Sequence, residues 1–285
     1  LKNLDWIELP STNVEGDISN LSNLEKLVIC ELGSTEVKGN ISALKNLKQL
    51  TWIDLHGTSV AGDISVFSGL NRLDRILLNN TNVTGNIKAL EKLNELIWIE
   101  LIKTKVSGNI SSLKDLSKLQ KIQLDETEVT GDIDSLSKLS SLESIRFVRT
   151  EVVGNIKILS SLDNLRGFGL SNTKITGDIL HLNGLENLRS FELKNTDVFG
   201  DIGNLRELNN LISLWLTNTD VYGDINSLKE FKDLVWIELA NTQVSGDISS
   251  LSTLKELKHS RQINLDGTNV SGTLILEGGT VITYD

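Results

Sequence analysis

The chain has 285 residues, a formal net charge of −10 and a sequence pI of about 4.9. Nucleic-acid phosphates and anionic membrane surfaces attract basic proteins, so this charge balance argues against both as the main partner. No run of about 18 apolar residues is present, which excludes a membrane-spanning helix within this sequence.

One pattern of 23 residues fills nearly the whole sequence, and residues 234–248 show it as L-x-x-I-x-L-x-x-T-x-V-x-G-D-I. Its threonine occurs twelve times, and ten of the eleven intervals are 23 residues while the last is 26. A glycine four positions after the threonine keeps the same step from Gly16 to Gly272. Such strict periodicity indicates a repeat architecture, in which each unit buries its core against its neighbours.

Each repeat predicts the same elements in the same order. The segment L-x-x-I-x-L, as at Leu4, Ile7 and Leu9, alternates with period two and predicts a strand. A short turn containing the threonine follows, and a valine or isoleucine then returns to the core. Leucines three positions apart, such as Leu21 and Leu24, predict a 3₁₀ or short helical return across the back. Successive strands must therefore stack in parallel, and the returns lie behind them.

The repeat resembles that of leucine-rich repeat proteins, whose hallmark is L-x-x-L-x-L-x-x-N-x-L, and the following x-G-x-I is similar to the plant-type subclass. The resemblance covers essentially all 285 residues. Threonine replaces the usual asparagine, and the proline that usually follows the isoleucine is missing, Pro10 being the only proline. The implied fold is an α/β-type solenoid, an arc with a concave parallel β-sheet and short 3₁₀, helical or irregular convex returns. The T-x-V-x-G-D-I form looks like that of bacterial and algal surface proteins, which implies a location at the cell surface or outside the cell.

The two ends depart from the repeat. We expect a solenoid of twelve repeats over residues 1–273 and a strand-like cap over 274–285, where Gly278 and Gly279 suggest a hairpin-like turn. Three residues are inserted around Lys258–Ser260. The sequence starts at Leu1 in mid-pattern without a polar capping segment, so we expect that a cap is missing from this chain or that a partner covers this end.

Three regular features have structural explanations. The threonine hydroxyls are expected to bond backbone groups of their own and the next coil, whereas an ice-binding face would need a flat, exposed threonine array.

The Asp or Asn after each repeat glycine suits a helix N-cap, whereas a calcium ladder would favour a carboxylate at most positions. Cys30, the single cysteine, replaces an Ile, Phe or Leu of the other repeats and is expected to be a small buried apolar residue, with a reactive thiol as the alternative.

Residues six, four and two positions before each threonine should point to the concave face. All five tryptophans lie in the first two of these columns: Trp6, Trp52, Trp98 and Trp236 in the first and Trp215 in the second. Three of the 23 positions of a repeat belong to these three columns, so a tryptophan placed at random would fall in one of them about three times in 23. A general preference of strands for aromatic residues does not explain why none occupies an inward position. The columns therefore predict a binding face.

Charged residues accompany the rings. Arg75 falls between Trp52 and Trp98 on adjacent strands and is expected to stack on either ring. The acidic candidates are Glu8, Glu31, Asp54 and Glu100 near the first rings and Glu238 near the last. The basic candidates in the middle are Arg146, Arg166 and Arg189, with Arg149 and Lys194 near them. Gly167 and Gly169 leave one strand bare, which predicts a notch beside Arg146. A solvated face of alternating charge is the other explanation for these charges.

Catalysis finds little support in the sequence. His56, His181 and His259 are far apart in repeat number and show no metal-ligand spacing, and the glycines do not form a phosphate loop. We therefore expect no enzyme activity, no cofactor and no metal.

The favoured function is recognition of a protein or peptide, and the acidic residues beside the tryptophans favour a basic protein or peptide. The alternatives are glycan binding, since Trp6, Trp52 and Trp98 recur on every second strand, and a structural subunit of a larger surface assembly.

Overall fold

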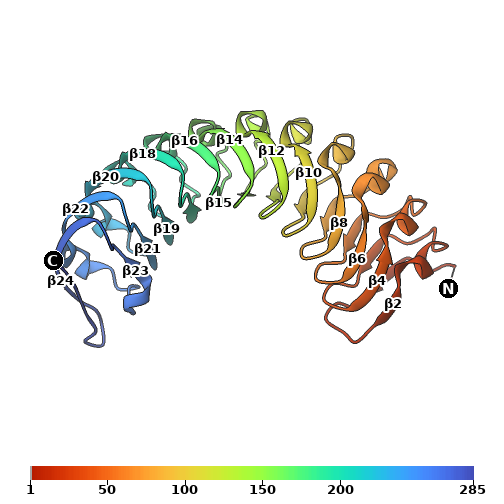
Figure 1. Cartoon of the computed structure of the whole chain (residues 1–285), viewed down its shortest axis with the longest axis horizontal. Helices are drawn as coiled ribbons and strands as arrows, with labels where there is room; N and C mark the ends of the chain where they lie inside the picture. Colours follow the sequence, from red (N-terminus) through yellow and green to blue (C-terminus); the bar gives the residue numbers. More distant parts are fainter. Residues whose placement is uncertain (1) are drawn as a thin grey trace. The chain divides into compact units, whose positions relative to one another are not determined.

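The computed structural model describes residues 2–285, so the expectation about the start at Leu1 lies outside the described part. The chain divides into two compact units, Leu1–Val152 and Val153–Asp285. In both, every coil contributes a strand to a first parallel sheet, a strand to a second parallel sheet and a 3₁₀ helix. The 3₁₀ helices follow the outer margin of each unit (Figure 1).

Unit 1 contains the first six complete coils. Its first sheet has the order β1 (Trp6–Glu8), β3 (Ile29–Glu31), β5 (Trp52–Asp54), β7 (Arg75–Leu77), β9 (Trp98–Glu100), β11 (Lys121–Gln123) and β13 (Ser144–Arg146). Its second sheet has β2 (Glu15–Asp17), β4 (Glu36–Asn40), β6 (Ser59–Asp63), β8 (Asn82–Asn86), β10 (Lys105–Asn109) and β12 (Glu128–Asp132). The helices are η1 (Ile18–Leu21), η2 (Ile41–Leu44), η3 (Ile64–Gly69), η4 (Ile87–Leu90), η5 (Ile110–Leu113) and η6 (Ile133–Leu136).

Unit 2 repeats this arrangement. Its first sheet has β15 (Gly167–Gly169), β17 (Ser190–Glu192), β19 (Ser213–Trp215), β21 (Trp236–Glu238) and β23 (Ile263–Asn264). Its second sheet runs from β14 (Glu151–Asn155), which begins at the unit boundary, through β16 (Lys174–Asp178), β18 (Asp197–Asp201), β20 (Asp220–Asp224), β22 (Gln243–Asp247) and β24 (Asn269–Ile275). The helices are η7 (Ile156–Ser161), η8 (Ile179–Leu182), η9 (Ile202–Leu205), η10 (Ile225–Glu230), η11 (Ile248–Thr253) and η12 (Ser260–Gln262).

The second sheet was not predicted from the sequence, where the segment x-V-x-G was interpreted as part of a turn. Its signal is nevertheless present, because from Val37 onward the valine or isoleucine is buried while the residue before it is exposed, as at Val106 and Lys105. The first sheet has residues 23 apart side by side, whereas the second pairs residues 21 apart, such as Ser107 with Glu128. Equivalent side chains are therefore direct neighbours only in the first sheet.

The C-terminal stretch expected to form a cap continues from the second sheet. β24 pairs antiparallel with β25 (Val281–Tyr284), with Thr273 opposite Thr283, so the chain turns back on itself at this edge. The inserted residues near Lys258 lead into η12, whose Gln262 is buried: its Oε1 accepts from Lys258 N and His259 N, each at 2.7 Å. Within residues 2–285 there is no helix both long and apolar enough to cross a membrane.

The core lies between the two sheets and the 3₁₀ helices. The inward leucines and isoleucines of the central coils, such as Leu73, Ile76 and Leu78, are fully buried. Cys30 occupies the same inward position in its coil and is also fully buried, which confirms its apolar role. Burial and the nearby carboxylates of Asp54 and Glu31 raise the pKa of its thiol to about 12, so the reactive thiolate is absent at neutral pH.

The repeat threonines from Thr35 to Thr242 are buried, as predicted, whereas Thr12 is exposed and Thr268 is partly buried. The hydroxyl of Thr104 donates to the carbonyl oxygen of Leu101 at 2.7 Å, and Thr35 does the same to Leu32 at 2.6 Å. The bond is made within the coil itself and stabilises the bend after the first strand. The expectation that the hydroxyls also bond the next coil is wrong for these threonines. Since these hydroxyls are buried and occupied, the threonines do not form an exposed array.

The Asp and Asn column caps the 3₁₀ helices, as predicted. The side-chain oxygen of Asn109 accepts from Ser111 N at 2.8 Å, and Asp247 accepts from Ser249 N at the same distance. These bonds satisfy a backbone N–H at the start of each helix that has no partner within the helix. Asp and Asn do this equally, which explains why they interchange along the column.

The residue before each threonine adopts a left-handed backbone, a feature that sequence reasoning missed. Its φ is close to +55°, as at Lys103 and Glu126, a region that favours Asn and Gly over other residues. In unit 2 the position is held by asparagines whose amides bond to one another from coil to coil. These bonds join Asn195 to Asn172 at 2.8 Å, Asn218 to Asn195 at 2.5 Å and Asn241 to Asn218 at 2.7 Å.

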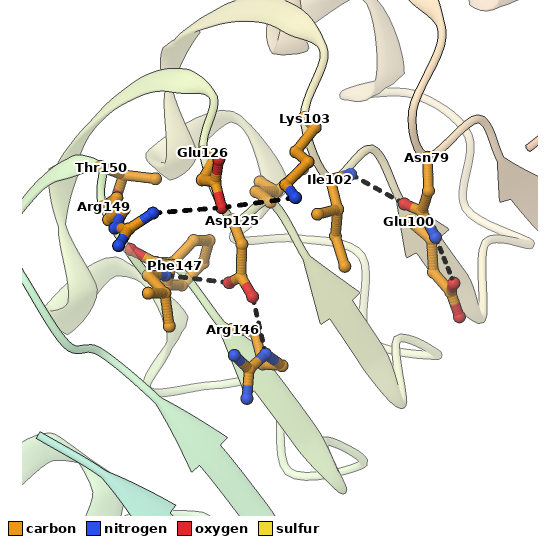
Figure 2. A network of polar contacts seen from close by, with 12 residues as sticks. Asn79, Glu100, Ile102, Lys103, Asp125, Glu126, Arg146, Phe147, Arg149 and Thr150 are labelled. Atoms are coloured by element: carbon orange, nitrogen blue, oxygen red, sulfur yellow. Dashed lines mark hydrogen bonds and ion pairs between the residues drawn. The ribbon is translucent and has the colours of Figure 1, made fainter. Parts of the chain in front are cut away.

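Replacing Glu126 by Asn is expected to raise the free energy of unfolding by about 0.5 to 1 kcal/mol, because Asn tolerates the left-handed backbone better. The carboxylate that is lost makes only long, exposed ion pairs, 3.9 Å to Lys103 Nζ and 3.6 Å to Arg149 Nη1 (Figure 2), and such pairs contribute little. The shift in the urea midpoint measures the effect. The control Glu128→Asn, at an exposed position of β12 with an ordinary backbone, should give no rise; an equal rise there would contradict this explanation.

Candidate functional site

The candidate site is the outward side of the first sheet, called here the first-sheet face of each unit. In the first-sheet strands from β3 to β21 the middle side chain, such as Ile53 or Ile99, is buried in the core and the two flanking residues face outward, whereas Ile7 in β1 is partly exposed. The five tryptophans lie at these outward positions. Trp52, Trp98, Trp215 and Trp236 are partly exposed, and Trp6 is 57% exposed.

In unit 1, Arg75 stacks between two tryptophans, which confirms the predicted cation–π contact and shows that it involves both rings. Its Cζ lies 4.4 Å from the ring centroid of Trp52 and 4.7 Å from that of Trp98. Strand pairing places these three residues side by side on β5, β7 and β9, with Lys121 next on β11. Lys121 Nζ is 5.6 Å from the Trp98 ring, so cations and indoles alternate along this row.

Two donors in this row have no acceptor among residues 2–285: Trp52 Nε1 and Arg75 Nε are buried without a hydrogen-bond partner. Asp74 Oδ1 is 3.7 Å from Arg75 Nε, too long for a hydrogen bond. Burying an N–H without an acceptor costs about 1 to 3 kcal/mol, so these two donors lower the stability of this row.

Several predicted charged residues are already paired within the protein. Glu100 binds Lys121 Nζ through Oε1 at 2.7 Å. Its Oε2 accepts from Asn79 Nδ2 at 2.8 Å, and Asn79 Oδ1 in turn accepts from Ile102 N at 2.7 Å (Figure 2). Asp54 accepts from the Nδ1 of His56 at 2.6 Å, and its carboxylate also accepts from the backbone N–H of His56. These two carboxylates therefore hold neighbouring coils and side chains in position.

Asp125 is a member of this network that sequence reasoning did not select. It is buried, and its carboxylate accepts from Arg146 Nε at 2.7 Å and from Val148 N at 2.9 Å (Figure 2). Its position two residues before the threonine of its repeat belongs to the third outward column, which was the available signal. The same column supplies Asn79, so polar residues there satisfy the backbone N–H of the next coil. Arg146 is thus oriented by Asp125.

Glu8 and Glu31 differ from these residues. They are neighbours across β1 and β3, with Asp54 next on β5, and the ion pairs and hydrogen bonds found for the described residues include no partner for either side chain. Burial, together with the like charges of Glu8 and Asp54, raises the pKa of Glu31, while Arg75 offsets part of the rise. The first-sheet face of unit 1 therefore carries uncompensated negative charge at this edge.

Glu31→Gln is expected to stabilise the protein at neutral pH. A carboxyl group with a raised folded-state pKa binds its proton more tightly when folded, so its favourable contribution is present below the ordinary pKa of 4.5 and is lost as pH rises through the folded-state value. The thermal midpoint of the variant should exceed that of the parent at pH 7 and approach it near pH 3. Glu36→Gln, at an exposed position of β4, is the matched control and should not reproduce this pH dependence; equal midpoints at pH 7 for Glu31→Gln would contradict the charge assignment.

Unit 2 has its own aromatic pair. Trp215 lies beside Glu238 in the sheet, and Trp236 lies beside Ser213. Lys194 Nζ is 5.8 Å from the Trp215 ring and 3.7 Å from Glu238 Oε2, so it connects the ring with the carboxylate.

Arg166 and Arg189 are exposed but lie one residue before β15 and β17. They are seven positions before the threonine, outside the outward columns, and so belong to the margin of the face. The notch predicted at Gly167 and Gly169 beside Arg146 stays a prediction. Within the described part of the chain, His, Cys, Asp and Glu form no group of three or more that could hold a metal ion.

No protein family and no curated protein matches the sequence. Solved structures do match its fold. The Arabidopsis receptor kinase HAESA, in complex with the peptide hormone IDA and the co-receptor SERK1, is 24% identical over 91% of this chain and 45% of its own, with a TM-score of 0.79. The LRR ectodomain of the Arabidopsis thaliana membrane receptor kinase GASSHO1/SCHENGEN3, in complex with CASPARIAN STRIP INTEGRITY FACTOR 2, is 21% identical over 95% of this chain and 36% of its own, with a TM-score of 0.77.

A plant ice-binding protein is also similar, at 20% identity over 88% of this chain and 82% of its own, with a TM-score of 0.71. The match covers less than half the length of each of the two receptor chains named above. The 23-residue repeat, the parallel sheets joined by 3₁₀ helices and these structural likenesses agree with one another. The chain therefore has the fold of the leucine-rich repeat proteins.

Proposed function

We propose that the first-sheet face binds a protein or peptide, and that the chain is a non-enzymatic recognition module at the cell surface or outside the cell. The observation that carries the proposal is the placement of all five tryptophans on this face, at positions where they contribute little to the core. Trp and Arg most often dominate the energy of protein interfaces, and Trp supplies a large contact area with little loss of conformational entropy.

The structural neighbours support peptide recognition. HAESA is a receptor bound to a peptide hormone, and its likeness covers 91% of this chain. That likeness concerns the fold, so the binding residues must come from this chain itself. In unit 1 we assign Trp6, Trp52, Arg75 and Trp98 as contacts, with Glu8 and Glu31 favouring a basic ligand. In unit 2 we assign Trp215, Trp236 and Glu238.

Glycan binding is the second candidate, since Trp6, Trp52 and Trp98 lie on every second strand and exposed rings can stack on sugars. The position of Arg75 weighs against it: the guanidinium occupies the space between Trp52 and Trp98 and covers the ring surfaces on which a sugar would stack. The likeness to an ice-binding protein does not extend to an exposed threonine array, because the repeat threonines from Thr35 to Thr242 are buried.

Selection from a displayed library of random peptides tests the proposal. Peptides that bind the protein should lose affinity for variants of the first-sheet face and keep it for variants of the second sheet. A glycan array run in parallel separates the second candidate, because sugar binding without peptide binding would favour it. Failure to select any peptide, or peptides indifferent to the first-sheet face, would count against peptide recognition.

A further inference from the structure

The first-sheet face of unit 1 contains a second gap built like the one that Arg75 fills. Trp52 and Trp98 lie two strands apart with Arg75 between them, and Trp6 and Trp52 lie two strands apart with Ile29 between them. All four pairings follow the same register, so the two gaps have the same spacing along the sheet. One gap holds a guanidinium, and the other holds a short apolar side chain.

The gap filled by Arg75 shows which group fits between two indoles on alternate strands. Parallel strands are about 4.8 Å apart, so indoles on alternate strands are separated by roughly 9 to 10 Å. The Cζ of Arg75 lies near the middle of that interval, 4.4 Å from one ring centroid and 4.7 Å from the other. A planar guanidinium stacks on both rings at this separation. Between Trp6 and Trp52 the same row supplies only Ile29, which is shorter than arginine and carries no charge, and Trp6 is 57% exposed.

The charges around the open gap suit a cation. Glu8 shares its strand and its outward side with Trp6, and Glu31 shares its strand and its outward side with Ile29. Asp54 is bonded to His56, whereas Glu8 and Glu31 lack an ion pair within the described part of the chain. Burial and, after it, the like charges of Glu8 and Asp54 raise the pKa of Glu31, and a cation from outside would relieve the repulsion among these carboxylates. A guanidinium matches carboxylates with paired hydrogen bonds better than an ammonium does.

We propose that unit 1 binds an arginine side chain of a peptide partner, with the guanidinium above Ile29, between Trp6 and Trp52, and paired with Glu31 and Glu8. This assignment rests on the proposed peptide-binding function and names the ligand group for which the face is built. The chain's own Arg75 is the internal example of the same contact.

Two capped pentapeptides test the assignment, Gly-Ser-Arg-Ser-Gly and the same peptide with citrulline, which keeps the shape of arginine but is neutral. Binding is followed by the indole N–H signals in nitrogen-15 NMR spectra, with Trp6 and Trp52 assigned by single Trp→Phe variants. The arginine peptide should shift these two signals and bind at least about fivefold more tightly than the citrulline peptide. Equal binding of both, or shifts confined to Trp215 and Trp236, would overturn the assignment.

Filling the gap from within gives a sharper test. Ile29→Arg places a guanidinium between Trp6 and Trp52, as Arg75 does between the next pair, and it should abolish binding of the arginine peptide while raising the thermal midpoint. Glu31→Gln should weaken binding about fivefold and also raise the midpoint at pH 7, a combination that a merely structural carboxylate would not give. Glu36→Gln is the control and should change neither. Unaltered peptide binding by a folded Ile29→Arg variant would overturn the assignment.

The two proposals fail separately. If library-selected peptides need Trp98 or Trp215 but lack arginine and are indifferent to Glu31→Gln, peptide recognition stands and the arginine site is wrong. If selected peptides ignore every first-sheet variant, both are wrong.

Discussion

Gly108→Ala is expected to lower the free energy of unfolding by about 2 to 4 kcal/mol, a large effect for one methyl group. Gly108 has φ +104°, a backbone conformation that residues with a side chain rarely adopt. A Cβ atom at this position would lie 2.3 Å from Asn86 Oδ1 and 2.6 Å from its Cγ. Asn86 caps η4 by accepting from Lys88 N at 2.9 Å, so relieving the clash also breaks the cap.

A control separates backbone strain from the steric clash. Gly184 has a similar φ of +97°, but a Cβ atom there would meet nothing within 4 Å. Gly184→Ala should therefore cost only the backbone term, about 1 kcal/mol. Chemical denaturation of both variants measures the difference. Equal losses would contradict the explanation that the repeat glycine is needed because the cap of the preceding coil lies against it.

Replacing Trp52 and Trp98 together by alanine is expected to weaken binding of a selected peptide by about 10- to 100-fold, since buried aromatic anchors commonly contribute 2 kcal/mol or more to an interface. The double variant also removes both rings from Arg75, which should lower stability by about 1 to 2 kcal/mol. Circular dichroism and the melting midpoint must therefore show that the variant is folded at the assay temperature. Titration calorimetry then gives the affinity.

The matched controls are Phe199→Ala and Tyr222→Ala. Both side chains are large, aromatic and exposed, but they lie on β18 and β20 of the second sheet. Their removal should leave the affinity unchanged. Peptide affinities that fall equally for the first-sheet and second-sheet variants would mean that exposed aromatic area, and not this face, accounts for binding.

The elements that could be predicted are those whose buried and capping residues recur with the period of the repeat. The first-sheet strands, the 3₁₀ returns, the Asp and Asn caps and the buried threonines follow from letters that recur every 23 residues. The second sheet was missed because only one buried valine stands between the threonine and the glycine, too short a segment to distinguish a strand from a turn. The left-handed position was missed because its residues vary, from Lys103 and Glu126 to the asparagines of unit 2.

The contacts of the candidate site were predictable where the strand register alone determines which side chains are neighbours. The stack on Arg75 follows from pairing residues 23 apart, which sets three side chains next to one another. The ion pairs could not be predicted in the same way, because a long side chain reaches several neighbours and only the coordinates show that Glu100 binds Lys121 and that Asp125 binds Arg146. Arg166 and Arg189 lie seven positions before their threonines, so counting from the threonine already excludes them from the outward columns.

The indole N–H spectrum of the protein, recorded with and without a saturating amount of a selected peptide, tests the central claim most directly. All five tryptophans lie on the first-sheet face, so their five signals report on that face alone. A peptide bound there should shift or broaden at least one of them, and peptides that compete with each other should affect the same signals. A peptide that saturates the protein while all five signals stay in place would show that the binding surface lies elsewhere.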